Sequence, residues 1–241
     1  WDIVSDFYWV PSYLGLKSIP QKQWKVDENT VSVPKDLTNP TGPLYRRLRS
    51  GDDYWEDVRR QEETFNHIFD LTFAVMPGVV VSDVFGKFTR AGTGYDYKLQ
   101  GQAIRDEYKW IGGGNVTTPD SFFISPQSVL AIELKFNAKT SLDQLSKYVA
   151  LIAGEELHRG HREYLDLVYL YPLQAEARFN KQTGFSASEL GKKHFDLLKE
   201  SAKNQQVKKF YEAEPIAIRR VLERLKVSCI TWQQLSGHLA Y

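Results

Sequence analysis

The chain has 241 residues, of which 42% are hydrophobic and 13% aromatic, and this composition is typical of an ordinary globular protein that buries a sizeable core. Its 31 lysine and arginine residues are balanced by 30 aspartate and glutamate residues, which gives a formal net charge of +1. A charge this small excludes a protein that coats nucleic acid through a general basic field, so any contact with nucleic acid must come from local patches.

Cysteine content and hydropathy indicate a cytoplasmic protein. Cys229 is the single cysteine, so no disulfide can form within the chain, and no set of Cys and His residues has the spacing of a zinc site. No apolar run approaches the ~18 residues of a membrane span, and no signal peptide is visible. We therefore expect no membrane partner.

The sequence divides into an N-terminal arm, 1–45, and one domain, 46–241. The arm is rich in Trp, Tyr, Pro, Ser and Asn without a sustained period, which predicts irregular structure with a short strand near "TVSVP". Within the domain we expect a core over 51–172 and a helical extension over 173–241.

A long amphipathic helix is predicted over 51–76, where apolar residues recur at helical spacing and Pro77 ends the run. Its apolar stripe consists of Trp55, Val58, Phe65, Phe69 and Phe73. Glu62 lies on that stripe, which is unusual for a charged residue. The β-branched run that follows, 79–85, predicts a strand.

The rest of the domain alternates strands and helices. We predict a buried hairpin over 118–136, a helix over 141–158, a strand over 164–172, helices over 186–201 and 215–226, and a final strand over 227–232. This order describes an α/β fold in which a central mixed β-sheet is flanked by helices on both faces.

The hairpin carries three charges that an apolar hairpin does not need: Asp120, Glu133 and Lys135. A four-residue loop at 125–128 pairs Ile124 with Val129, and counting back in this register places Asp120 opposite Glu133. Two facing carboxylates favour a divalent cation between them, and oxygen ligands suit Mg²⁺ or Mn²⁺. The alternative is structural: Glu133 and Lys135 form an ion pair while Asp120 caps a turn.

These residues resemble a known family. "PD" at Pro119-Asp120 followed by "ELK" at Glu133 to Lys135 resembles the motif of the PD-(D/E)XK nuclease superfamily, and "QLSKY" from Gln144 looks like the Q-x-x-x-Y motif of its RecB-type branch. The resemblance implies a restriction-endonuclease-like core with the order helix, three-strand meander, helix, strand. RecB-type nucleases often show G-x-x-D and D-x-K where this chain has "TTPD" and "ELK", so the branch of the superfamily stays open. We favour an endonuclease over an exonuclease.

The resemblance also implies a metal site. Asp120, Glu133 and the backbone carbonyl of Leu134 would bind Mg²⁺, for which Mn²⁺ is a substitute, and Lys135 would position or activate the attacking water. The expected activity is hydrolysis of phosphodiester bonds by a Mg²⁺-dependent deoxyribonuclease.

Three further residues complete the set that the resemblance implies. Gln144 and Tyr148 share one helix face because they are spaced i, i+4, so both can point at the site. Glu62 is the candidate for an acidic residue that several family members carry on the first helix. The alternative for Glu62 is a charge at the edge of the apolar stripe.

The expected partner is nucleic acid, and DNA in particular, while a homodimer stays open. Basic clusters that would contact phosphates lie at 45–49, 59–60, 192–193, 208–209 and 218–226, although each is also typical of a solvated helix face. Two other functions stay open: a non-catalytic nucleic-acid-binding or scaffolding module of the same fold, and an unrelated α/β interaction protein.

Overall fold

A computed structural model describes residues 26–27, 30–31, 72, 76–90, 95, 97–99, 117, 119–135 and 139–239 of the chain. The chain divides into two compact units, Trp1–Phe65 and Asn66–Tyr241. In the first unit, β1 (Val26–Asp27) pairs antiparallel with β2 (Thr30–Val31). Strand β2 lies in "TVSVP", where a short strand is expected. The rest of the expected arm, and the expected helix over 51–76 with Glu62, lie outside the described residues except for Thr72 and Met76.

The second unit is built on a five-stranded mixed sheet with the order β3-β4-β5-β6-β7. Its strands are β3 (Tyr97–Leu99), β4 (Ser121–Ile124), β5 (Ser128–Leu134), β6 (Tyr164–Tyr171) and β7 (Leu225–Thr231). The first three form an antiparallel meander, whereas β5, β6 and β7 run parallel to one another. β5 is buried along its whole length because it lies in the middle of this sheet.

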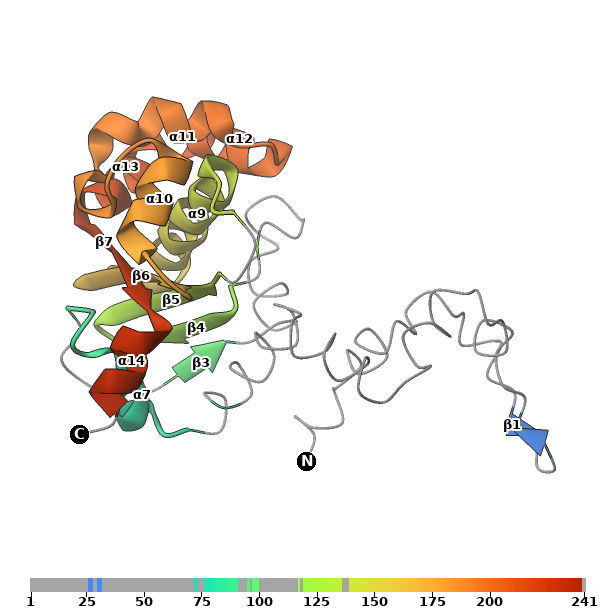
Figure 1. Cartoon of the computed structure of the whole chain (residues 1–241). Coiled ribbons are helices and arrows are strands. Elements are labelled where there is room, and N and C mark those ends of the chain that lie inside the picture. Colours follow the sequence, from blue (N-terminus) through green and yellow to red (C-terminus); the bar gives the residue numbers. More distant parts are fainter. Residues whose placement is uncertain are drawn as a thin grey trace, which may run out of the picture. The chain divides into compact units, whose positions relative to one another are not determined.

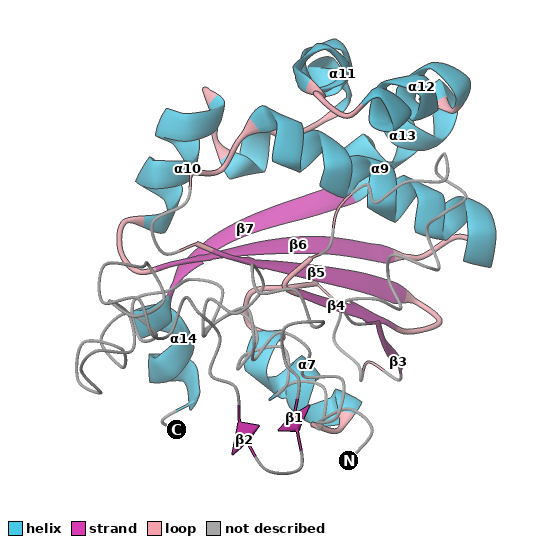
Figure 2. Ribbon diagram, turned by 90° about the vertical axis from the view of Figure 1, so that its right-hand side faces the viewer, coloured by secondary structure: helices cyan, strands magenta, loops and turns pink. Residues whose placement is uncertain are grey.

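Helices cover both faces of the sheet, as the sequence predicts (Figure 2). On one face lie α9 (Leu142–Arg159), α10 (Ala175–Thr183), α11 (Phe195–Ser201), α12 (Gln205–Ala213) and α13 (Pro215–Arg224). On the other face lie α7 (Gly78–Phe85) and α14 (Trp232–Leu239), which contact each other. The described part of this unit is therefore an α/β fold with an open mixed sheet.

Helix α9 forms the centre of the main core. It packs on the sheet with one side and against α11, α12 and α13 with the other, so that every residue from Tyr148 to Ala153 is completely buried (Figures 1 and 2). The enclosed part of the helix has no polar face, which explains its run of Val, Ala, Leu and Ile from Val149 to Ala153. Among the described residues, no helix has both the length and the apolar character needed to cross a membrane.

The predicted strand over 79–85 is wrong, because this segment forms helix α7. Val81, Val84 and Phe85 are buried at helical spacing, while Val79 is exposed. The helix begins where the chain passes very close to another segment: a Cβ atom at Gly78 would lie 1.3 Å from the carbonyl oxygen of Tyr95. Side-chain preference for strands is weak, and the burial of one helix face overrides it here.

The C-terminal predictions are right in element type and partly wrong in extent. The single helix expected over 186–201 is broken into two 3₁₀ turns, Ala187–Glu189 and Lys192–His194, and helix α11. Gly191 between the turns has an extended backbone, which a continuous helix does not allow. The helix expected over 215–226 ends at Arg224, and the final strand starts at Leu225. At its other end this strand stops at Thr231, and Trp232 is the first residue of α14.

Candidate active site

The hairpin of β4 and β5 has the predicted loop and register. The main-chain N–H of Ser125 donates to the carbonyl of Ser128 at 2.9 Å, and Ile124 is paired with Val129. The pairing continues to Ser121 opposite Ile132. Asp120 precedes Ser121, and Glu133 follows Ile132. The register therefore brings the two acids to the same end of the hairpin.

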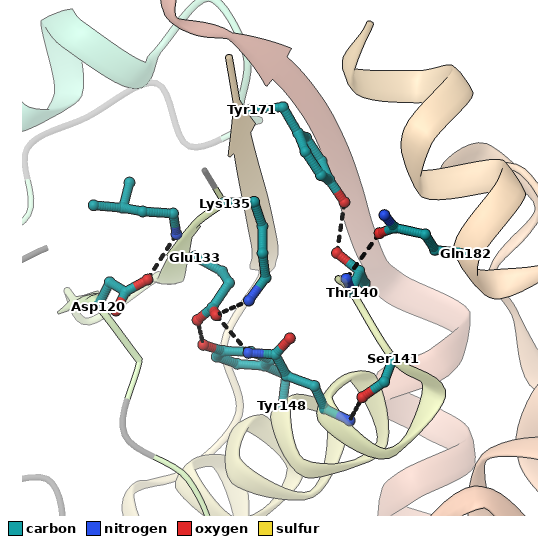
Figure 3. A network of polar contacts seen from close by, with 10 residues as sticks. Asp120, Glu133, Lys135, Thr140, Ser141, Tyr148, Tyr171 and Gln182 are labelled. Carbon is teal, nitrogen blue, oxygen red and sulfur yellow. Dashed lines mark hydrogen bonds and ion pairs between the residues drawn. The ribbon is translucent and has the colours of Figure 1, made fainter. Parts of the chain in front are cut away.

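Glu133 lies on the face of β5 that α9 covers, and its side chain points toward that helix (Figure 3). Only 5% of Glu133 and 4% of Lys135 is exposed, and the Lys135 ammonium Nζ lies 2.6 Å from Glu133 Oε1. The ion pair of the structural alternative is therefore present. However, a buried ion pair is no more stabilising than well-packed apolar residues of the same size, so stability alone does not account for it.

Two further donors reach Glu133 from α9. Gln144 Nε2 donates to Oε1 of Glu133, and the Tyr148 hydroxyl donates to Oε2. The helix starts where it does because the Ser141 hydroxyl accepts from the main-chain N–H of Gln144 at 3.1 Å, which is a standard N-cap. This cap puts Gln144 in the first turn, and the i, i+4 spacing puts Tyr148 one turn below it.

Tyr148 keeps its proton at any ordinary pH. Its burial is complete, and this burial is the main cause that raises the pKa of its hydroxyl well above the usual value of 10.0. The negative charges of Glu133 and then Asp120 raise the pKa further. The neutral hydroxyl is therefore a permanent hydrogen-bond donor to the Glu133 carboxylate.

Asp120 is half-buried just before β4, and its carboxylate reaches across to the neighbouring strand. Oδ2 of Asp120 accepts from the main-chain N–H of Leu134 at 2.7 Å (Figure 3). This bond fixes the carboxylate directly beside the main chain of the residue that follows Glu133. The structure thus brings Asp120, Glu133, Lys135 and α9 together at one end of the sheet.

We found no match to a family model, to a curated protein or to a solved structure.

The side chains at this end of the sheet fit a hard divalent cation in their chemistry. Asp120, Glu133 and the main-chain carbonyl of Leu134 are oxygen ligands of the kind that Mg²⁺ and Mn²⁺ prefer. Within the described ranges, no group of three or more His, Cys, Asp and Glu side chains could hold a metal ion by itself. Glu62, the third predicted acid, lies outside those ranges, so its place relative to the site is not described.

The sequence prediction missed two tyrosines that enclose the site from β6. Tyr169 is paired in register with Glu133, and its ring meets that of Tyr148 edge to face, with 6.4 Å between the ring centroids. Tyr171, two residues later on the same face, shares a hydrogen bond of 2.6 Å between its hydroxyl and that of Thr140 (Figure 3). The alternation in "LVYLY" places both rings on one face and was the available signal.

Thr140 belongs to the short connection from Lys135 to α9. Its main-chain N–H donates to Oε1 of Gln182 on α10 at 2.8 Å, while its hydroxyl contacts Tyr171 on β6. The start of α9 is therefore held by contacts from both α10 and β6. These contacts position the first turn of α9, from which Gln144 reaches Glu133.

Proposed function

We propose that this protein is a metal-dependent nuclease that hydrolyses phosphodiester bonds, with DNA as its substrate. The observation that carries the proposal is the environment of Glu133. This buried carboxylate at a strand end receives donors from Lys135, Gln144 and Tyr148, and the Asp120 carboxylate lies just before the adjoining strand. Buried charged residues with several specific partners cluster at functional sites.

The order of elements supports a restriction-endonuclease-like core. The resemblance implies a three-strand meander followed by a helix and a further strand, and the chain has β3, β4 and β5 as a meander, then α9, then β6. The motif residues lie on the matching elements: Asp120 precedes β4, Glu133 lies on β5, and Gln144 and Tyr148 lie on α9.

The residues would divide the chemistry among them. Asp120, Glu133 and the Leu134 carbonyl would hold Mg²⁺, which supplies Lewis-acid polarisation of the phosphate and a water of lowered pKa. Gln144 and Tyr148 orient the Glu133 carboxylate and leave it fewer ways to rotate. The ammonium of Lys135 orients the attacking water and offsets the negative charge that develops on the phosphate oxygens as the P–O bond breaks.

A cleavage panel tests the proposal. The full chain is incubated with Mg²⁺, Mn²⁺ or EDTA and with linear, supercoiled and single-stranded DNA and RNA. We expect metal-dependent cleavage of DNA that falls by about 10²–10⁴-fold in Lys135→Ala, the usual loss when an acid–base group is removed.

Lys147→Ala is the matched control, because Lys147 also forms an ion pair of 2.7 Å, with Asp143 in the first turn of α9, but does not contact Glu133. It is expected to cleave at the wild-type rate. Absence of metal-dependent cleavage on every substrate would rule out the nuclease, and dependence on free DNA ends would identify an exonuclease.

One observation favours a second function, a non-catalytic nucleic-acid-binding module of the same fold. Both oxygens of Glu133 already accept hydrogen bonds from protein donors, and within the described ranges no third acid joins the site. Such a module would bind DNA with the same affinity in EDTA and in Mg²⁺ and would not cleave it, so a binding assay run beside the cleavage panel separates the two functions.

A further inference from the structure

The Lys135 ammonium lies where a positive charge is needed in the absence of a metal ion. It contacts Oε1 of Glu133 at 2.6 Å, and the two side chains are 5% and 7% exposed. A buried carboxylate without a counter-charge is strongly unfavourable. Lys135 supplies that counter-charge from the position just after the end of β5, two residues beyond Glu133 and on the same face.

An ammonium group and a divalent cation compete for this carboxylate. Both would lie against the oxygens of Glu133, and two cations in contact with one buried carboxylate repel each other strongly because the surroundings screen charge poorly. Lys135 and Gln144 occupy both lone-pair positions of Oε1, whereas Tyr148 takes one of the two on Oε2 and leaves the other for a cation. A cation bound there would lie next to the Lys135 ammonium across a single buried carboxylate, so their repulsion drives the ammonium away from Glu133.

We propose that Lys135 is an internal counter-ion of Glu133, and that a divalent cation displaces its ammonium group from the carboxylate and so frees it for the substrate phosphate. This inference rests on the proposed function, because it assumes that Glu133 binds the metal ion.

The charges of the site agree with this exchange. Asp120, Glu133 and Lys135 together carry a single net negative charge. A divalent cation converts it to a single net positive charge, which one phosphodiester group neutralises. When metal and substrate are both bound, the displaced ammonium pairs with the substrate phosphate. Without metal, it pairs with Glu133.

The exchange makes a prediction about the protein alone. In Lys135→Met the carboxylate of Glu133 loses its counter-charge, so the variant is expected to melt about 5–10 °C below the wild type in EDTA. With the competing ammonium removed, the same variant is expected to bind Mn²⁺ at least about tenfold more tightly, and its Tm to rise more on addition of Mn²⁺ than that of the wild type. The measurements are isothermal titration with Mn²⁺ and thermal unfolding in EDTA and in Mn²⁺, on the full chain.

Three variants make the comparison specific. Lys147→Met removes the Lys147–Asp143 ion pair of 2.7 Å on α9 and is expected to keep wild-type Mn²⁺ affinity. Lys135→Arg retains the positive charge and is expected to bind Mn²⁺ no more tightly than the wild type. Lys135→Gln, which keeps a donor for Glu133 without the charge, is used in place of Lys135→Met if the latter does not fold, with the same expected gain in affinity.

The outcomes separate the two proposals. If Lys135→Met and Lys135→Gln bind Mn²⁺ as the wild type does while Glu133→Gln loses binding, the metal site stands and the counter-ion role of Lys135 is overturned. If neither the wild type nor the Lys135 variants bind Mn²⁺, the proposed metal-dependent nuclease falls, and the counter-ion inference falls with it. Tighter binding by the Lys135 variants than by the wild type supports the inference whether or not DNA is cleaved.

Discussion

At the scale of single residues, the site depends on how one carboxylate is held. Glu133 receives donors from its own strand and from two positions of α9, so its orientation is set by the sheet and the helix together. Side chains that orient a metal ligand without binding the metal usually matter to activity nearly as much as the ligand does. If Glu133 binds a metal ion as proposed, Tyr148 is such a residue, because it donates to Glu133 from a completely buried position.

Tyr148→Phe tests this role by removing only the hydroxyl that donates to Glu133. We expect metal-dependent cleavage or Mn²⁺ affinity to fall by about 10–100-fold. The expected loss in the free energy of unfolding is only about 1 kcal/mol, the usual value for one hydrogen bond.

Tyr211→Phe is the matched control. The Tyr211 hydroxyl is also buried and donates at 3.2 Å to a carbonyl of α9, that of Ser146, but it does not contact Glu133. The two variants should therefore lose similar stability and differ in activity. Equal activities would mean that Tyr148 has a structural role alone.

At the scale of elements, the sequence predicted the segments whose patterns are unambiguous. The hairpin register followed from its loop, and the limits of α9 followed from Ser141 as N-cap and from Gly160, whose φ of 95° suits glycine. Helices α10 and α12 were not predicted, because each has only nine residues and a period of 3.6 shows poorly over so short a stretch. Their existence depends on packing against other elements, which local patterns do not contain.

The same limit applies to the site. The predicted register brought Asp120 and Glu133 to one end of the hairpin because pairing rules act between neighbouring strands. The contact of α9 with Glu133 and the enclosure by Tyr169 depend on how a helix and a parallel strand fold back over the hairpin. Those contacts are long-range, and only the Q-x-x-x-Y resemblance pointed to part of them.

Gly78 sets the position of α7 and gives an element-scale prediction. Gly78→Ala would place Cβ 1.3 Å from the Tyr95 carbonyl oxygen, which the backbone must move to avoid. We expect the free energy of unfolding to fall by at least about 2 kcal/mol, measured by denaturant unfolding.

Gly237→Ala in α14 is the matched control, since a Cβ there meets no atom within 4 Å. Alanine is the better helix former, so this variant should gain about 0.5–1 kcal/mol. A Gly78→Ala protein as stable as the wild type would contradict the close approach of α7 to Tyr95.

At the scale of the whole molecule, another buried carboxylate lies on the face of the sheet opposite Glu133. Asp166 on β6 is 1% exposed, and its Oδ1 accepts from the main-chain N–H of Arg90 at 3.3 Å. Its Oδ2 has no hydrogen-bond partner among the described residues. Burial is the main cause that raises the pKa of Asp166, and the positive charge of Arg90 opposes it.

This raised pKa links Asp166 to the pH dependence of stability. Because the folded protein holds the proton more tightly than the unfolded chain, Asp166 adds stability at acidic pH, and this contribution is lost as the pH rises through its folded pKa. Asp166→Asn cannot titrate, so its free energy of unfolding relative to the wild type should improve as the pH rises above about 4 and level off once Asp166 is deprotonated in the folded protein. Urea unfolding at several pH values measures the difference, and a difference that does not change with pH would contradict the raised pKa.

The parallel pairing of β5 with β6, and of β6 with β7, decides how much of the chain the proposed chemistry would need. A peptide that carried the hairpin alone would contain Asp120, Glu133 and Lys135 but neither donor of α9, and its central strand would lack its parallel neighbour. Grafting the short motif onto another hairpin would therefore transfer the acids without the orientation of Glu133. A transplant that keeps this orientation needs α9 and the parallel strands as well as the hairpin, so a designer who wants the proposed chemistry must move a domain instead of a motif.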